Sequence, residues 1–137
     1  MEISFTSVIP VLRIFNIEKA DEFYQGFLGF TVDWDHRFDP GAPLYRQISR
    51  GNLILHLSEH HGDGCPGVHL RVMMKGVEAF QREISSKRYP YMRPGLETMP
   101  WDDRDGCDRS LRQFHPLLRA PRTTRFALTA RRRLTVA

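Results

Sequence analysis

The sequence has few cysteines and no long apolar run. Cys65 and Cys107 are the only two cysteines in 137 residues, and two are too few for a disulfide framework. No stretch approaches the ~20 consecutive apolar residues that span a bilayer, and the first residues lack the basic region of a signal peptide. We therefore expect one reduced, cytoplasmic domain with no membrane partner.

Acidic residues are scarce at the end of the chain. Residues 103–137 contain nine Arg, no Lys and three Asp, the last of them Asp108, whereas residues 1–102 contain 11 Lys or Arg and 13 Asp or Glu. The net charge of +4 therefore comes from the tail. A basic tail can bind nucleic acid, which is one hypothesis. We disfavour specific nucleic-acid binding, because no predicted strand carries the aromatic pattern of an RNA-recognition sheet.

The first half of the chain alternates between strand and helix patterns. Residues 7–14 form an apolar, β-branched run that predicts a buried strand. Asn16 can cap a helix whose apolar residues recur at three- and four-residue steps, and Gly29 can end it. Residues 44–49 and 53–58 predict two strands of a hairpin.

A further strand is predicted between this helix and the hairpin. Residues 30–35 alternate between apolar and polar side chains, which places Phe30, Val32 and Trp34 on one face. A loop rich in Asp, Pro and Gly follows. The order of the first half is therefore β-α-β-β-β.

A second, incomplete copy of this pattern follows a Gly-rich loop at residues 59–67. Residues 68–74 predict a strand, residues 76–87 a helix and residues 91–98 another strand. A full copy should continue to about residue 120, but its last two strands are missing from the sequence.

The two copies are related by a fixed offset. His69 follows Ile9 by 60 positions, and Val77 follows Ile17 by the same number. An internal repeat of this kind, with the strand-helix order in both copies, indicates two related structural modules.

Several segments carry a family likeness. "VIPVLRIFNIEKADEFYQGFLGFTVDW", with its Phe23-Tyr24 pair followed by "LGF", resembles the opening module of the glyoxalase/bleomycin-resistance/extradiol-dioxygenase proteins, the vicinal oxygen chelate superfamily. "NLILHLSEHHGDG", "PGVHLRV" and "RPGLETMPW" are similar to its bleomycin-resistance branch, and the likeness covers residues 5–104.

This resemblance implies an α+β fold. Paired βαβββ modules would form a curved, cup-like mixed sheet with helices on the outer face, usually in a homodimer, and here the second module would be incomplete. The single domain, residues 1–137, would then comprise module one at 5–58, a linker at 59–67, a truncated module two at 68–105 and an aberrant basic tail at 106–137.

The tail departs from the family pattern in a specific way. The resemblance implies a segment close to D-P-F-G-N and then a strand ending in F-x-E, where the chain has "DRSLRQFHPLLRAP". Allowed codons for this stretch, read one base later, give Ile-Asp-Pro-Phe-Gly-Asn and, further on, Phe-Cys-Glu. We therefore predict that the reading frame shifts at or just after Asp105, and that residues 106–137 are irregular or weakly helical.

Two histidines are candidates for the inside of the cup. Leu53, Leu55 and Leu57 alternate with His56, so His56 should point away from the helix-packed face. The same alternation places His69 and Arg71 in the cup.

By resemblance, His56 and His69 occupy two of the superfamily's four metal-binding positions. The third holds Ile9, which cannot coordinate, and the fourth would be the Glu of the shifted frame. A site for one divalent metal (Zn, Ni, Mn or Fe) is thus one hypothesis. The alternative is that both histidines are polar groups that line a pocket.

Aromatic residues suggest a different use of the same cup. Trp34, Phe38, Tyr45 and Trp101 could line a cleft for a planar, cationic ligand, although Trp34 and Trp101 could equally be core or dimer-interface residues. We expect a small-molecule binder that sequesters an organic compound, such as a cationic aromatic antibiotic. The rival hypothesis is a metal-dependent lyase, isomerase or dioxygenase that uses His56, His69 and the lost Glu.

Overall fold

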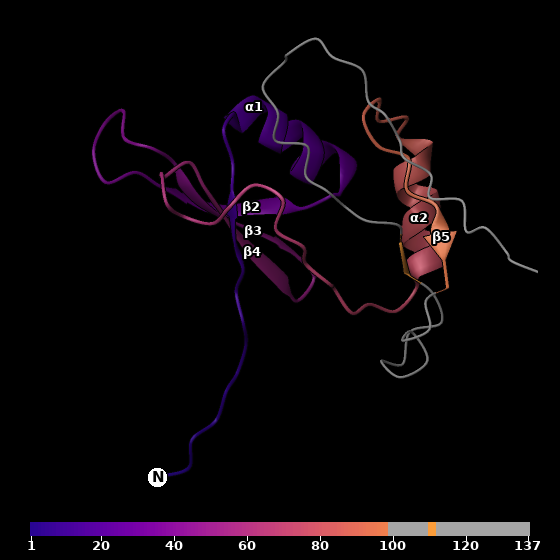
Figure 1. The fold of residues 1–137 in the computed structure, drawn as a ribbon, viewed down its shortest axis with the longest axis horizontal. Coiled ribbons are helices and arrows are strands. Elements are labelled where there is room, and N and C mark those ends of the chain that lie inside the picture. Colours follow the sequence, from indigo (N-terminus) through magenta and orange to yellow (C-terminus); the bar gives the residue numbers. More distant parts are fainter. Residues whose placement is uncertain (99–109, 112–137) are drawn as a thin grey trace, which may run out of the picture.

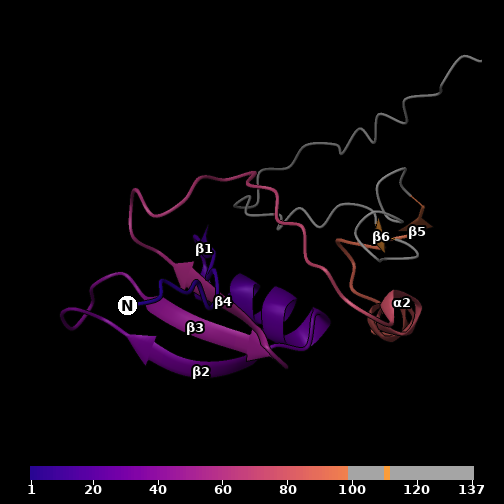
Figure 2. The ribbon, with the colours of Figure 1, turned by 90° about the horizontal axis from the view of Figure 1, so that it is seen from below.

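The described part of the structure, a computed structural model, comprises residues 1–98 and 110–111. Figures 1 and 2 show a sheet with one long helical segment against it, and a second helix beyond that segment. In chain order the elements are β1 (Val11–Arg13), α1 (Ile17–Ala20), the π-helix η1 (Asp21–Phe27), β2 (Thr31–His36), β3 (Tyr45–Arg50), β4 (Leu53–Ser58), α2 (Val77–Ser86), β5 (Leu96–Glu97) and β6 (Ser110–Leu111).

The first half forms a four-stranded mixed sheet in the order β1-β4-β3-β2. β1 is parallel to β4, with Val11 opposite His56, and the other neighbouring strands are antiparallel. The turn between β3 and β4 contains Gly51 at φ 59°, a left-handed conformation that glycine adopts without strain. The α+β class and the β-α-β-β-β order predicted for this half are confirmed.

The helical segment begins and ends where the sequence predicts. The Asn16 side chain accepts a hydrogen bond of 2.8 Å from the Lys19 backbone N–H, and Gly29 follows the helix at φ 74°. Between them the chain widens into the π-helix η1, in which the Leu28 N–H donates to the Phe23 carbonyl at 2.9 Å. The wider turn contributes three buried aromatic residues, Phe23, Tyr24 and Phe27.

The hydrophobic core lies between this helical segment and one face of the sheet. Figure 2 shows the segment lying across that face. The opposite face, called the open face below, is not covered by any described helix. The buried core residues are Leu12, Ile14, Ala20, Phe23, Tyr24, Phe27, Leu28, Phe30, Ile48, Leu55, Leu57 and Ile84.

The prediction that Phe30, Val32 and Trp34 share one face is wrong at Trp34. Phe30 is buried and Val32 packs against the core, but Trp34 is 41% exposed. The register of β2 against β3 shifts between Val32 and Trp34, which makes a β-bulge. A bulge adds one residue to one strand and so reverses the alternation beyond it.

The second helix packs on the first module through aromatic and polar contacts. Ile84 is fully buried in the core, and the ring of Tyr89 stacks on that of Phe27 with centroids 4.5 Å apart. Arg50 forms an ion pair of 2.7 Å with Glu83 of α2. These contacts attach the second module to the helical face of the sheet.

Of the two strands predicted for the second module, one is not formed and the other is much shorter than predicted. Residues 68–74 have no strand, and of residues 91–98 only Leu96–Glu97 forms one. A strand needs a neighbour that takes up its backbone hydrogen bonds, and among the described residues after α2 the only strand pairing is that of β5 with β6, two residues each. The described part of the second module therefore consists of α2 and this short strand pair, and its predicted truncation stays a prediction.

Part of the tail contradicts the expectation of irregular backbone. Ser110–Leu111 forms β6 and pairs antiparallel with Leu96–Glu97. The rest of the predicted out-of-frame tail lies outside the described residues, and the frameshift itself stays a prediction. None of the described helices is both long and apolar enough to cross a membrane.

Candidate functional site

The alternation of β4 divides its side chains between the core and the open face. Leu55 and Leu57 are buried beneath the helical segment, whereas His56 is only partly buried and contacts residues of the open face. The sequence-based placement of His56 is thus confirmed. Because Gln47 lies directly opposite His56 in the register and Tyr45 is two residues from Gln47 on β3, all three side chains belong to the same face.

Both ring nitrogens of His56 have hydrogen-bond partners. Nδ1 lies 2.8 Å from the hydroxyl oxygen of Tyr45, and Nε2 lies 3.0 Å from Oε1 of Gln47. The imidazole is therefore held in one orientation by side chains of the adjacent strand β3.

Asp33 extends this arrangement to the edge strand. The amide Nε2 of Gln47 donates to one carboxylate oxygen of Asp33 at 3.0 Å, and the hydroxyl of Ser49 donates to the other at 2.8 Å. Asp33 is the extra residue of the bulge. Sequence reasoning missed both Asp33 and Gln47, although the pairing of residues opposite His56 could have identified Gln47.

The bulge also brings Trp34 into this group. The Trp34 ring stacks on that of Tyr45 with centroids 6.1 Å apart and planes 20° apart. The centroid of the Trp34 ring lies 5.3 Å from that of the His56 ring, in an edge-to-face arrangement. Trp34, Tyr45 and His56 therefore form one exposed aromatic cluster, which we call the open-face cluster.

Phe38 belongs to a neighbouring group at the loop end of the sheet. Its ring lies edge-to-face with that of His36 at 4.8 Å and with that of His60 at 5.5 Å, and Phe38 is 72% exposed. Phe38 is a predicted site residue, but its ring contacts His36 and His60 and not the open-face cluster.

The loop after β4 is anchored to the sheet. The buried Ser58 hydroxyl donates to Asp63 at 2.7 Å and accepts from the His60 backbone N–H at 3.0 Å. His60 is partly buried, and its Nε2 has no hydrogen-bond partner. Ser58 therefore holds the start of this loop, including His60, against the end of β4.

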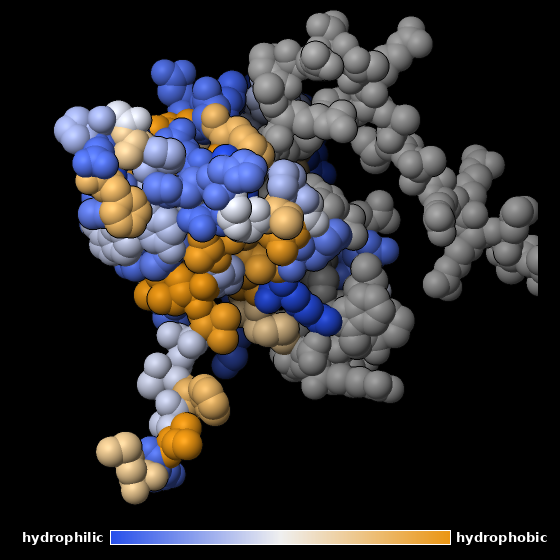
Figure 3. Space-filling view, turned by 60° about the vertical axis from the view of Figure 1, so that its left-hand side comes forward, coloured by the Kyte–Doolittle hydropathy of each residue, from blue (hydrophilic) through white to orange (hydrophobic). Residues whose placement is uncertain are grey.

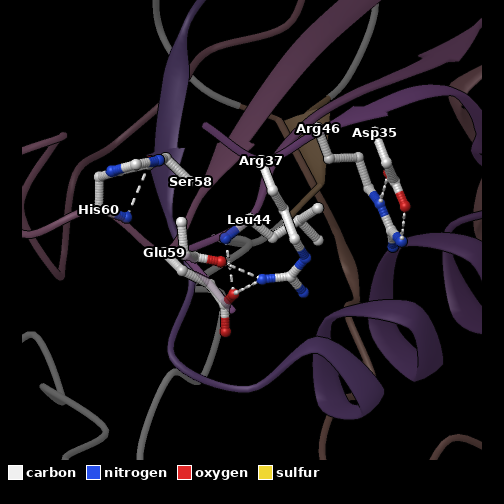
Figure 4. Close-up of polar contacts among 8 residues, drawn as sticks. Asp35, Arg37, Leu44, Arg46, Ser58, Glu59 and His60 are labelled. Carbon is white, nitrogen blue, oxygen red and sulfur yellow. Dashed lines mark hydrogen bonds and ion pairs between the residues drawn. The ribbon is translucent and has the colours of Figure 1, made fainter. Parts of the chain in front are cut away.

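Glu59 joins this loop to the one between β2 and β3. Its carboxylate accepts from the Leu44 backbone N–H at 2.8 Å and lies 3.8 Å from the Arg37 guanidinium (Figure 4). An open hollow of about 410 Å³ adjoins this contact. It is lined by none of the predicted site residues, but by Ile17, Arg37, Gly41, Ala42, Pro43 and Glu59.

Beneath the cluster, on the core side, Arg46 forms a buried ion pair. Its side chain is only 9% exposed, and it contacts the carboxylates of Asp35 and Asp21 (Figure 4 shows the Asp35 pair). The hydrogen bond from Arg46 holds the pKa of Asp35 below its ordinary value. Arg46 therefore ties β3 to β2 and η1 under the candidate site.

The remaining predicted site residues do not join the open-face cluster. His69 and Arg71 lie in the irregular, exposed segment of residues 68–74, so their predicted placement on a strand is wrong. Trp101 lies outside the described residues. Within the described ranges, no three or more His, Cys, Asp or Glu side chains are grouped so that they could hold a metal ion.

Comparison with known proteins identifies the family. A family model described as "Glyoxalase superfamily protein" matches residues 1–114, which include the whole β1–β4 sheet and the first residues of the predicted tail. No curated protein matches the chain. Since the match covers most of the chain and the sheet and helices have the expected α+β arrangement, the protein belongs to the glyoxalase superfamily.

Proposed function

We propose that the protein binds a small planar organic molecule on the open face of the β1–β4 sheet and sequesters it without chemical conversion. The observation that carries this proposal is the open-face cluster, in which Trp34 is exposed to solvent and stacked on Tyr45. A large aromatic side chain left exposed beside polar partners is typical of a ligand-binding surface.

The chemistry of the donor set supports binding over metal-dependent catalysis. Both ring nitrogens of His56 are engaged in hydrogen bonds, with Tyr45 and with Gln47. By the family resemblance the third metal position is Ile9, which has no donor atom, and His69 is not on a strand beside His56. These residues therefore do not fit the superfamily's metal site.

A second copy of the chain is the partner we propose for the remaining apolar surface. Val68, Leu70, Val72 and Met73 are each 41–48% exposed, and Figure 3 shows apolar surface next to the point where the N-terminal segment leaves the body. Four exposed apolar side chains within one six-residue segment favour an interface. A molar mass of twice 16.0 kDa in light scattering would support the homodimer, and the mass of one chain would contradict it.

Intrinsic fluorescence tests the proposed function directly. With Trp101→Phe introduced, Trp34 is the only tryptophan, and titration with a cationic aromatic antibiotic of the bleomycin type should quench it and raise the melting temperature. Trp34→Ala should weaken binding about tenfold, measured by calorimetry, because the stacking surface is lost.

The matched control is Tyr91→Ala, since Tyr91 is an exposed aromatic residue of the second module and should leave affinity unchanged. If such compounds and simple planar aromatic probes change neither the fluorescence nor the melting temperature, the proposed function is wrong.

A further inference from the structure

The hydrogen-bond chain through the open-face cluster defines what kind of ligand the site accepts. We infer that Asp33, Gln47 and His56 fix Tyr45 as a hydrogen-bond acceptor toward the ligand, so that the site selects planar molecules bearing N–H or O–H donors. This inference rests on the proposed function and names its ligand class. It also assigns the protonation of His56.

The direction of the chain follows from the chemistry of its ends. A carboxylate can only accept hydrogen bonds, so the atom of Gln47 that lies 3.0 Å from Asp33 is its amide nitrogen. The amide oxygen of Gln47 then faces His56. Because an amide oxygen accepts, Nε2 of His56 carries the hydrogen.

Ser49 supports this orientation of the Gln47 amide. Its hydroxyl donates to the second oxygen of Asp33 at 2.8 Å, so two neighbouring side chains of β3 hold the two carboxylate oxygens. A reversed Gln47 amide would place its oxygen against a carboxylate oxygen, which is a repulsive contact. The orientation of Gln47 is therefore fixed by Asp33 and not by His56.

In its neutral form, the His56 imidazole in turn determines the hydrogen-bond role of Tyr45. With its hydrogen on Nε2, His56 offers a lone pair at Nδ1, and the Tyr45 hydroxyl 2.8 Å away donates to it. The only hydrogen of the Tyr45 hydroxyl is thereby used. Its oxygen retains lone pairs that can only accept, beside the stacked ring of Trp34.

The resulting surface favours positive or donor-bearing rings. The face of Trp34 attracts cations through its π electrons, and the oxygens of Tyr45 and Asp33 are acceptors. The net charge of the whole chain is +4, which by itself would attract anions. A preference for a cationic ring would thus come from the site and not from the overall charge.

The same chain leaves His56 poorly suited to a metal ion. Nε2 carries a hydrogen, and the lone pair of Nδ1 is used by Tyr45, so coordination would require the loss of one of these hydrogen bonds. Metal binding needs a deprotonated nitrogen with its lone pair available. These hydrogen bonds are therefore incompatible with the role of metal ligand that the family resemblance implies for His56.

Proton NMR tests the assignment of His56 without any ligand. We expect a downfield Nε2–H signal that exchanges slowly with water, is absent in His56→Ala and is lost in Gln47→Ala, while Gln81→Ala, a glutamine change in α2, leaves it unchanged. One equivalent of Zn²⁺ should not move it. A hydrogen on Nδ1 in the neutral state, or a stoichiometric shift of the His56 signals with Zn²⁺, would overturn the inference.

A pair of matched probes tests the ligand class. Benzamidine is a planar cation with N–H donors and benzoate is a planar anion with acceptors only. In the Trp101→Phe background, benzamidine should bind about tenfold more tightly than benzoate by Trp34 quenching. Tyr45→Phe, which keeps the ring but removes the acceptor, should reduce this preference at least about threefold, whereas Tyr91→Phe should not change it.

The outcomes separate the inference from the proposed function. Equal or tighter binding of benzoate, with Trp34 still quenched, would overturn the ligand class and leave binding at the cluster intact. If neither probe quenches Trp34, both the ligand class and the proposed function fail, and the Nε2–H signal still decides the assignment of His56.

Discussion

β1 and residues 68–74 begin the two modules at equivalent positions, yet only β1 is a strand. β1 is paired with β4, where the His56 N–H donates to the Pro10 carbonyl at 3.0 Å and the Ile14 N–H donates to the Ser58 carbonyl at 2.8 Å. Residues 68–74 have similar apolar alternation but no ladder, and their apolar side chains are exposed. An apolar, alternating sequence is therefore not sufficient for a strand, because the backbone also needs a partner.

The two modules differ in the same way in their cores. Almost all buried core residues belong to the first module, and the second contributes Ile84 and Val77 as buried apolar residues among those described. The first module thus provides the packing on which α2 rests. This difference can be tested by changes in either module.

The largest expected effect is on the first module's core. Phe27→Ala removes a ring that is 2% exposed and stacked on Tyr89, and should lower the free energy of unfolding by about 4 kcal/mol. Leu70→Ala, in the unpaired segment, should change it by less than about 0.5 kcal/mol. Urea denaturation followed by circular dichroism measures both. A loss of stability at Leu70 similar to that at Phe27 would mean that residues 68–74 are buried, either in a core or in the proposed interface between two copies.

Restoring the predicted reading frame after Asp105 is the second test. If the restored sequence supplies the missing strands, residues 68–74 gain a neighbour, and the free energy of unfolding should rise by about 3 kcal/mol. Hydrogen exchange should then show protected amides at residues 68–74. Unchanged stability and unprotected amides in the restored chain would contradict the frameshift account.

A smaller effect is expected at the ion pair beneath the sheet. Arg46→Met should lower the free energy of unfolding by about 2 kcal/mol, because it leaves Asp35 and Asp21 without their buried partner. Arg37→Met is the control, since the Arg37 side chain is 39% exposed and should cost less than about 0.5 kcal/mol. Equal costs would show that burial does not strengthen the Arg46 contacts.

Acid should weaken the first module through Asp35. The hydrogen bond from Arg46 lowers the pKa of Asp35, so the stabilisation is present above the ordinary carboxyl pKa of about 3.9 and is lost as the pH falls through the lower folded-state value. Asp35→Asn should therefore be less sensitive to pH below about pH 4 than the wild type. Parallel acid-denaturation curves for the two proteins would contradict this.

The smallest effect is expected at the link between the modules. Glu83→Gln breaks the ion pair with Arg50, but the two side chains are 34% and 42% exposed, and such a pair contributes at most about 1 kcal/mol. The effect should shrink further at high salt because exposed charges are screened. A loss of several kcal/mol, measured by urea denaturation, would mean that α2 is held mainly by charge and not by Tyr89 and Ile84.

Much of the first module could be predicted from local patterns. The cap at Asn16, the end of the helix at Gly29 and the alternation of β4 each depend on residues only a few positions apart. For the same reason the sequence placed His56 opposite the leucine face. The aromatic candidates Trp34 and Tyr45 were also found, but their contact with each other was not.

What the sequence determined by itself is the order of elements, the family likeness and the face of His56, because these follow from short-range spacing. The tertiary structure decided the rest. A β-bulge in the pairing of β2 with β3 placed Trp34 on the open face beside Asp33, and the strand opposite His56 supplied Gln47. Residues 68–74 have no paired neighbour among the described residues and form no strand there. Each of these depends on which backbone lies alongside, and pairing between distant segments is not encoded in the period of either segment alone.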